Sequence, residues 1–343
     1  MSHPAQHLVR RGICSLATGL IISLVTISGC SVNTENIGTQ IPNKPLTISH
    51  DAANTPITSR GIGPALTHAT LDPQKPPATN FALTNWKITL PDATEYLPDW
   101  LTAGNEVANT FYTSPQTGAM VFNCPTQGST TSSATKYSRT ELREMLRGLN
   151  TRPSTKGIGR NNWVLSTAPH QNQASAGGID GTLEAVLSVD YVSKTGPAHM
   201  IGRVIVGQIH GEDDEPVRIY YRKLPHNTKG SVYFASEHPG GEDVFYPMIG
   251  SSSNSAADPE DGIALGEKWG YRIHIEGRQL SVRIIREDGR YVEQSLTIGE
   301  EYNNDWFYFK AGVYNQNNNG NPDEYAQASF FKLKATHKQY NKQ

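Results

Sequence analysis

The sequence is poor in charged residues and contains no basic run, and both shortages argue against a nucleic-acid-binding protein. Charged side chains make up 18% of the 343 residues, and the formal net charge is −2. Proteins that bind nucleic acid usually carry a basic face, so no nucleic-acid partner is expected. The length leaves room for one large all-β domain or for two ordinary domains.

Several chemical signatures are also missing. No serine-hydrolase, phosphate-loop or dinucleotide-binding pattern stands in a supporting context. The 11 histidines are scattered without metal-ligand spacing, so neither a metal site nor a cofactor is expected. Consecutive carboxylates at Glu212–Glu215 point alternately along the chain and are typical of a solvated turn. No pair of carboxylates facing each other across a cleft, as in a glycosidase, can be assigned.

Cysteine is scarce, and its positions indicate a processed N-terminus. Arg10 and Arg11 precede an apolar stretch, Ile13–Ile27, which is short for a membrane span but suits a secretory signal. The stretch ends in Ile27-Ser28-Gly29-Cys30, which resembles the lipobox of bacterial lipoproteins. That resemblance implies a signal peptide over 1–29 and a lipid on Cys30. The alternative is an ordinary signal peptide cut near Cys30.

A lipidated Cys30 implies a protein anchored in the cell envelope. Ser31, rather than Asp, follows it, which fits sorting to the outer membrane. The polar segment 30–79 then predicts a flexible tether. Cys124 remains as the one thiol of the domain, so no internal disulfide is expected, and it is interpreted as a buried small residue.

From about residue 80 to 340, short alternating segments joined by Gly, Asn and Ser predict an antiparallel sandwich or barrel. Glu276-Gly277-Arg278 between two alternating runs is a hairpin signal. Long loops are expected around 211–225 and 245–262. Strands are expected around 86–90, 111–122, 183–191, 204–211, 217–221, 271–275, 280–284 and 331–335.

Three stretches carry candidate chemistry. The first, Trp306–Gln316, alternates between an apolar face and a face with Tyr308, Lys310 and Tyr314. The second, Val204–Gly211, is β-branched and predicts a strand on which Gln208 and His210 share a face. Each pattern alone also fits an ordinary solvated strand.

The third stretch, Ser138–Met145, leaves its structure open. As a strand it places Arg139, Glu141 and Arg143 on one face, where two guanidinium groups suit a carboxylate ligand. Its Glu, Leu, Arg and Met residues favour a helix slightly on pattern alone. A salt-bridged solvated face is the simpler alternative.

Taken together and in this order, these stretches resemble polysaccharide lyase family 7, the alginate lyases. The matching segments are Arg139–Arg143, Gln208–His210 and Tyr308–Gln316, with Trp86–Pro91 similar to the family's first strand. The resemblance implies an all-β jelly-roll sandwich of two antiparallel sheets with a concave substrate cleft, and a strand at Arg139–Arg143. It implies catalytic roles for Arg143, Gln208, His210 and Tyr314, and substrate binding by Arg139, Glu141, Tyr308, Lys310, Asn315 and Gln316.

The implied reaction is β-elimination on alginate, a uronate polymer, by a monomeric catalytic domain. Arg143 and Gln208 would neutralise the sugar carboxylate, and Tyr314 would protonate the leaving oxygen. The base would be His210 or Tyr314, depending on the face of the C5 hydrogen. Glu141 would orient the arginines. In this family Ile209 is associated with guluronate-containing substrate, and long loops would favour attack from a chain end.

Two other functions remain compatible with the sequence. One is a sandwich that binds polyuronates without cleaving them. The other is a lyase acting on a different polyuronate, such as glucuronan.

Overall fold

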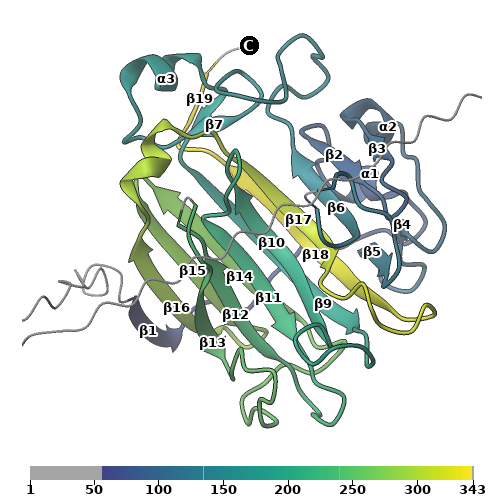
Figure 1. Ribbon diagram of the computed structural model, residues 1–343. Coiled ribbons are helices and arrows are strands. Elements are labelled where there is room, and N and C mark those ends of the chain that lie inside the picture. Colours follow the sequence, from purple (N-terminus) through teal and green to yellow (C-terminus); the bar gives the residue numbers. More distant parts are fainter. Residues whose placement is uncertain (1–55, 134, 239, 342–343) are drawn as a thin grey trace, which may run out of the picture. The chain divides into compact units, whose positions relative to one another are not determined.

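The computed structural model describes residues 56–133, 135–238 and 240–341 (Figure 1). The expected signal peptide and the lipidated Cys30 lie outside these residues. Among the residues described, no helix is both long and apolar enough to cross a membrane.

Two large antiparallel sheets form the domain, as the jelly-roll expectation required. The first sheet has the order β1-β16-β15-β14-β9-β18-β5-β4 and the second β13-β12-β11-β10-β17-β6-β2-β3. A small sheet, β19-β8-β7, includes one parallel pair, β7 with β8. The strands of the first sheet are β1 (Ile57–Ile62), β4 (Phe111–Thr113), β5 (Met120–Pro125), β9 (Gly181–Tyr191), β14 (Trp269–Glu276), β15 (Gln279–Arg286), β16 (Arg290–Thr297) and β18 (Tyr325–Thr336).

The second sheet carries the three stretches singled out in the sequence, on β6, β10 and β17. Its strands are β2 (Trp86–Thr89), β3 (Glu95–Tyr96), β6 (Arg139–Glu144), β10 (Arg203–His210), β11 (Val217–Arg222), β12 (Ser231–Ser236), β13 (Val244–Ile249) and β17 (Tyr308–Asn315). The small sheet has β7 (Trp163–Val164), β8 (Gly178–Ile179) and β19 (Gln339–Tyr340), and the helices are α1 (Pro77–Asn80), α2 (Pro98–Thr102), α3 (His170–Ser175) and the 3₁₀ helix η2 (Glu300–Asn304).

The core lies between the two sheets, and the two-residue period of β17 explains how that strand faces it. Phe309, Ala311 and Val313 are fully buried in the main apolar cluster, as their alternation predicted. β17 and β18, both yellow in Figure 1, belong to opposite sheets and face each other across this core. The alternate side chains of β17 therefore point to the outer, concave face of the second sheet.

A glycine lets the two sheets approach each other next to the functional stretches. A Cβ atom on Gly207 would lie 2.6 Å from the Tyr271 ring, so only glycine fits under that ring. Tyr271 donates a hydrogen bond to the Val206 carbonyl at 3.1 Å. The pairing of β10 with β17 shifts register between Ile205 and Gly207, so β17 carries one residue more than β10 there, before Tyr314.

Two expectations about irregular segments were wrong. Residues 57–62, within the expected tether, form β1 and pair in register with β16 at the sheet edge. The segments 211–225 and 245–262 are not long loops throughout: the first contains β11, where a strand was also expected, and the second contains most of β13. In each case the ladder hydrogen bonds to a neighbouring strand decide the structure; the partner of β1 lies far away in the sequence, whereas β11 and β13 pair with the strands that precede them.

Three sequence interpretations were confirmed. Strands β14 and β15 form the hairpin, with Glu276 opposite Gln279 and Gly277 at φ 54° in the turn. Cys124 is a buried free thiol, and burial raises its pKa to about 12. Arg139–Glu144 is strand β6, which corrects the slight helical preference of its residues, because pairing with both β2 and β17 outweighs intrinsic propensity.

A buried carboxylate fastens the C-terminal segment beneath the second sheet. Glu144 Oε2 accepts hydrogen bonds from Trp163 Nε1 and from the Phe309 backbone N–H, both at 3.2 Å. Its Oε1 lies 2.9 Å from His337 Nε2. One side chain therefore joins β6, β7, β17 and the end of β18.

Replacing Glu144 with Ala should lower the free energy of unfolding by about 3–5 kcal/mol, because its buried partners lose their acceptor. Urea denaturation would measure the loss. The matched control is Glu184→Ala, which removes a partly exposed pair with Lys332 at 3.0 Å and should cost about 0–1 kcal/mol. Equal losses in the two variants would contradict this assignment.

Candidate active site

The concave face of the second sheet brings the predicted residues into register. Strand pairing sets Arg143 opposite Lys310, and Lys310 opposite Gln208, across β6, β17 and β10. Two residues further along the same pair of strands, Tyr308 lies opposite His210. Because neighbouring strands are about 4.8 Å apart, these side chains form a continuous polar surface on rigid sheet.

Glu141 lies at the centre of this surface and is completely buried. Its Oε2 lies 2.6 Å from Lys310 Nζ and 3.1 Å from Arg139 Nη1. Its Oε1 accepts a hydrogen bond from Gln208 Nε2. Burial alone would raise the pKa of Glu141, but the charges of Lys310 and Arg139 outweigh burial and lower it. Glu141 is thus an ionised support beneath Arg139 and Lys310, rather than between Arg139 and Arg143 as expected. Its complete burial contradicts the expected direct contact with substrate.

Two cations share this one carboxylate, so the cluster has a net positive charge. Burial, followed by the charge of Arg139, lowers the pKa of Lys310 to about 8, against the opposing effect of Glu141. One N–H of the Gln208 amide is engaged by Glu141, and Gln208 Oε1 has no hydrogen-bond partner among the described residues. Lys310 and Arg143 therefore supply the positive charge at the centre of the row.

Arg143 is held rigidly from the side. Its Nη2 donates hydrogen bonds to the Thr155 carbonyl and to Asn162 Oδ1, both at 2.8 Å. Its guanidinium carbon lies 4.0 Å from the centre of the Tyr308 ring. A guanidinium fixed in this way is preorganised to receive a carboxylate.

Each ring nitrogen of His210 has a polar neighbour. Nδ1 donates to the Gly211 carbonyl at 2.7 Å, and Nε2 lies 3.1 Å from Glu215 Oε1. The ring stacks on Tyr308 with centroids 4.9 Å apart. Burial lowers the pKa of His210 to about 4, although the Glu215 carboxylate opposes the fall. The imidazole is therefore neutral near neutral pH.

Tyr314 lies beyond the charged cluster. The Arg139 guanidinium carbon is 3.9 Å from its ring centre, and Lys310 Nζ is 5.8 Å away. Burial raises the pKa of Tyr314, against the opposing charge of Arg139. The phenol is therefore protonated at neutral pH and can donate its proton.

Two residues predicted to bind substrate, Asn315 and Gln316, have buried side chains that form hydrogen bonds within the protein. Asn315 is buried on the core side, where Nδ2 donates to the Cys124 carbonyl at 3.1 Å and Oδ1 accepts from the Asn317 N–H at 3.2 Å. Its position, one residue after Tyr314, turns it away from the concave face, so the structure contradicts a direct binding role. Gln316 is almost fully buried, and its Oε1 accepts from Arg203 at 3.2 Å.

Sequence reasoning missed several residues of this surface. Lys87 on β2 lies opposite Arg143 and pairs with Glu95 at 2.6 Å, and the alternation of 86–89 could have revealed it. Glu215 was assigned to a solvated turn, yet it touches His210. No local pattern distinguishes it from its acidic neighbours.

Two pockets open along the row, with volumes of about 250 and 190 Å³. The first is lined by Lys87, Arg143, Thr155, Lys156, Glu212, Asp213, Trp306 and Tyr308. The second is lined by Lys87, Thr89, Glu95, Thr131, Thr135, Arg139, Arg143, His210, Tyr308 and Lys310. Within the described ranges, no group of three or more His, Cys, Asp or Glu side chains is arranged to hold a metal ion.

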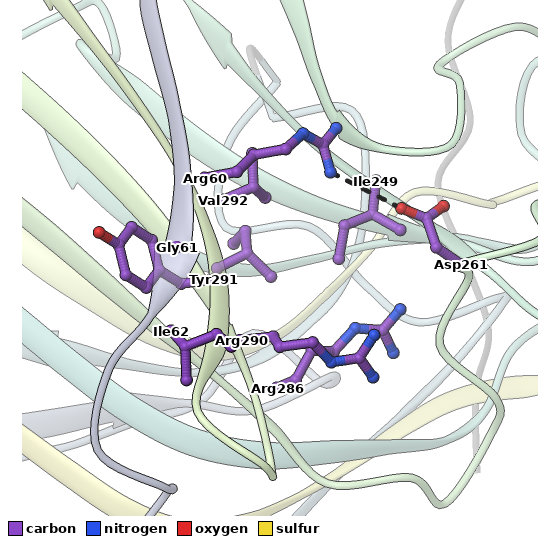
Figure 2. Close-up of a pocket in the computed structure, with 10 residues that line it drawn as sticks. Arg60, Gly61, Ile62, Ile249, Asp261, Arg286, Arg290, Tyr291 and Val292 are labelled. Atoms are coloured by element: carbon purple, nitrogen blue, oxygen red, sulfur yellow. Dashed lines mark ion pairs between the residues drawn. The ribbon is translucent and has the colours of Figure 1, made fainter.

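A larger cavity of about 370 Å³ lies elsewhere, at the edge formed by β1, β15 and β16 (Figure 2). Its three arginines are each matched by a carboxylate: Arg60 by Asp261 at 3.8 Å, Arg286 by Glu267 at 2.8 Å and Arg290 by Asp288 at 2.7 Å. This cavity therefore lacks the surplus positive charge found on the concave face.

Comparison with known proteins gives the same family as the motifs. A family model described as alginate lyase matches residues 81–337. An alginate lyase of Klebsiella pneumoniae is 48% identical over 280 residues, covering 76% of this chain and 91% of the relative. The crystal structure of the alginate lyase from Klebsiella pneumoniae has a TM-score of 0.74 at 46% identity, covering 76% of this chain and 98% of that one. Alginate lyase A1-II', a member of polysaccharide lyase family 7, gives 0.56 at 25% identity, with 76% and 98% covered.

Proposed function

Since the chain belongs to the alginate lyase family, polysaccharide lyase family 7, it is a polysaccharide lyase, and we propose that the polar row on its concave face performs β-elimination on alginate. The observation that carries this proposal is the in-register arrangement of Arg143, Lys310 and Gln208 beside His210 and Tyr314. It sets cations, a neutral imidazole and a protonated phenol on one rigid surface.

The chemistry follows from the acidity of the substrate. The C5 hydrogen of a uronate is barely acidic while the neighbouring carboxylate is charged, so that charge has to be neutralised first. Arg143 and Lys310 are placed to pair with the carboxylate and to stabilise the enolate that forms when C5 loses its proton. His210, neutral through burial, takes the C5 proton when that hydrogen faces it.

Elimination is completed at the C4 oxygen. The electron pair from the C5–H bond forms the C4–C5 double bond, the C4–O bond breaks, and Tyr314 gives its proton to the leaving oxygen. The product is an unsaturated uronate at the new non-reducing end. For the C5 epimer whose hydrogen lies on the opposite face, Tyr314 would be both base and acid.

We propose a preference for guluronate-containing substrate, because Ile209 stands between Gln208 and His210. Isoleucine at this position is associated with such substrate in the family that the sequence resembles. Ile209 is fully buried in the core. It would therefore act on preference through the position of β10 rather than by touching the sugar.

We also propose attack from a chain end, because the concave face is filled beyond Tyr314. Tyr220 on β11 and Tyr233 on β12 are each only 1% exposed and stack with centroids 5.0 Å apart. Phe245 packs on both rings at 5.9 Å. The two pockets of the row lie on the other side, toward β2 and β6. A sugar chain would thus extend from the reacting bond in one direction only.

Arg222 fastens the loops at this filled end. Its guanidinium donates to the Ile201 carbonyl at 3.2 Å, the Ser252 carbonyl at 3.3 Å and Asn254 Oδ1 at 2.8 Å, and also to the Ala198 carbonyl. Four acceptors on one buried guanidinium make this end of the cleft a fixed wall.

Early product analysis tests this proposal. With guluronate-rich, mannuronate-rich and mixed alginate, absorbance of unsaturated ends should rise while viscosity falls only slowly, with the shortest products first and guluronate-rich polymer degraded fastest. Glucuronan serves as the control polymer and should give little absorbance. Mixed large oligomers at the earliest times would contradict end attack, and faster cleavage of glucuronan would contradict the substrate assignment.

A further inference from the structure

His210 is clamped by the turn that follows it. The Gly211 N–H donates to the Asp214 carbonyl at 2.8 Å, and the Glu212 N–H donates to Asp305 Oδ1 at 3.0 Å. A Cβ atom on Gly211 would collide with the Asp305 carboxylate, so the turn needs glycine there. This turn places the Gly211 carbonyl at one ring nitrogen and the Glu215 carboxylate at the other.

The two contacts define which nitrogen of His210 is available for a proton. A carbonyl oxygen can only accept, so Nδ1 carries the ring's proton and donates it to Gly211. Any further proton has to bond to Nε2, 3.1 Å from Glu215 Oε1. The positive charge of the resulting imidazolium would form directly beside a carboxylate.

We propose that Glu215 is a positioning residue of the reaction, whose carboxylate beside Nε2 stabilises the imidazolium formed when Nε2 takes the C5 proton. This inference rests on the proposed β-elimination. In this step the C5–H bond breaks and its proton bonds to Nε2, while its electron pair forms the C4–C5 double bond. The C4–O pair leaves on the oxygen, which takes the proton of Tyr314. Glu215 itself exchanges no proton and touches no sugar.

Glu215 is held in place by two groups, one on β11 and one just after β12. Its Oε2 lies 3.5 Å from Arg218 Nη1 on β11, and its backbone N–H donates to Glu237 Oε2 at 3.4 Å, just beyond β12. Its side chain is 17% exposed and that of His210 is 19% exposed, so solvent screens their contact weakly. The carboxylate is therefore preorganised before substrate arrives.

A purely structural ion pair between Glu215 and Arg218 would not explain the cluster. Arg218 already has Glu237 at 3.3 Å and Asp243 as partners. Three carboxylates around one guanidinium leave a surplus of negative charge. Burial, the hydrogen bond to Glu215 and repulsion raise the pKa of Glu237 to about 7, which is the expected response to that surplus. Of the three carboxylates, Glu215 is the one beside His210.

The local charges set the sign of the effect. Burial lowers the pKa of His210, Lys310 and Arg139 lower it further, and Glu215 raises it. Without Glu215 the ring would be a weaker base, protonated only at lower pH. The charged or titratable groups facing the pair are Tyr308, Lys310 and Arg139 around His210, and Arg218, Glu237 and Lys310 around Glu215.

The deciding variant is Glu215→Gln, which keeps the shape of the side chain and removes its charge. The substrate for this test is the alginate polymer on which His210→Ala loses activity. On it we expect the kcat of Glu215→Gln to fall about 100-fold with KM nearly unchanged, because Glu215 does not touch the sugar. In ¹⁵N NMR titrations the midpoint of the His210 ring should move to lower pH by about one unit or more. A merely structural role would leave that midpoint unmoved.

Asp214→Asn is the matched control. It removes the same charge from the same turn, where the Asp214 carboxylate accepts only from the Gly240 N–H, at 3.4 Å, among the contacts of the described residues. Its kcat and the His210 midpoint should remain those of the wild type. If Glu215→Gln keeps the wild-type kcat or midpoint while His210→Ala is inactive, the positioning role is overturned but the proposed chemistry stands. If His210→Ala is fully active on every polymer, the base assignment itself fails, and the role of Glu215 fails with it.

Discussion

Replacing Tyr314 with Phe should reduce kcat by about 10²–10⁴-fold, the usual contribution of a positioned general acid. The substitution removes only the hydroxyl. The ring would keep its contact with the Arg139 guanidinium at 3.9 Å and its edge contact with Tyr137 at 6.2 Å, so the cleft should keep its shape. KM should therefore change little, and absorbance of unsaturated ends under saturating alginate would measure the loss.

Tyr308→Phe is the control for this prediction, since it also removes one phenolic hydroxyl from the same strand. The Tyr308 ring is packed between Arg143 at 4.0 Å and His210 at 4.9 Å, and both contacts survive the substitution. Burial raises the pKa of Tyr308 to about 12, and its packing between Arg143 and His210 gives its hydroxyl no assigned part in the reaction. We expect a loss of less than about 10-fold. A severe loss in Tyr308→Phe together with an active Tyr314→Phe would exchange the two assignments.

The strands that bear the site were predictable where a single period dominates. β17 alternates between core residues and polar residues, and the structure buries Phe309, Ala311 and Val313 as that pattern requires. β6 was ambiguous because Glu, Leu, Arg and Met favour a helix in isolation. Its neighbours β2 and β17 supply the hydrogen bonds that make it a strand, and those partners lie far away in the sequence.

Side-chain partners from other elements account for what the sequence did not reveal. Glu215 resembles the three acidic residues before it, and only the positions of Arg218 and Glu237 distinguish it. Asn315 follows Tyr314 in a matching motif, but a strand turns consecutive side chains to opposite faces, so the motif includes a residue of the core side. Similarly, β1 has no clear alternation and is ordered by its pairing with β16.

The charge of the cleft depends on Glu141, and Glu141→Gln should lower kcat/KM by about 10²–10³-fold. Glu141 is the main group that raises the pKa of Lys310, which burial and Arg139 hold at about 8. Without the carboxylate, that pKa should fall further, and Lys310 should lose its proton at lower pH. Because the protonated amine is the form that pairs with a uronate, activity is lost as pH rises through the pKa of Lys310.

The pH profile of kcat/KM distinguishes this effect from simple damage to the fold. In the wild type we expect the alkaline fall near pH 8, and in Glu141→Gln at lower pH. The control is Glu293→Gln, which removes a carboxylate paired with Arg283 at 2.7 Å on the opposite sheet and should leave the alkaline fall in place. Lys310→Arg adds a second test, because a guanidinium stays protonated and should extend activity to higher pH in any variant that still binds substrate. An unchanged alkaline fall in both Glu141→Gln and Lys310→Arg would show that another group controls it.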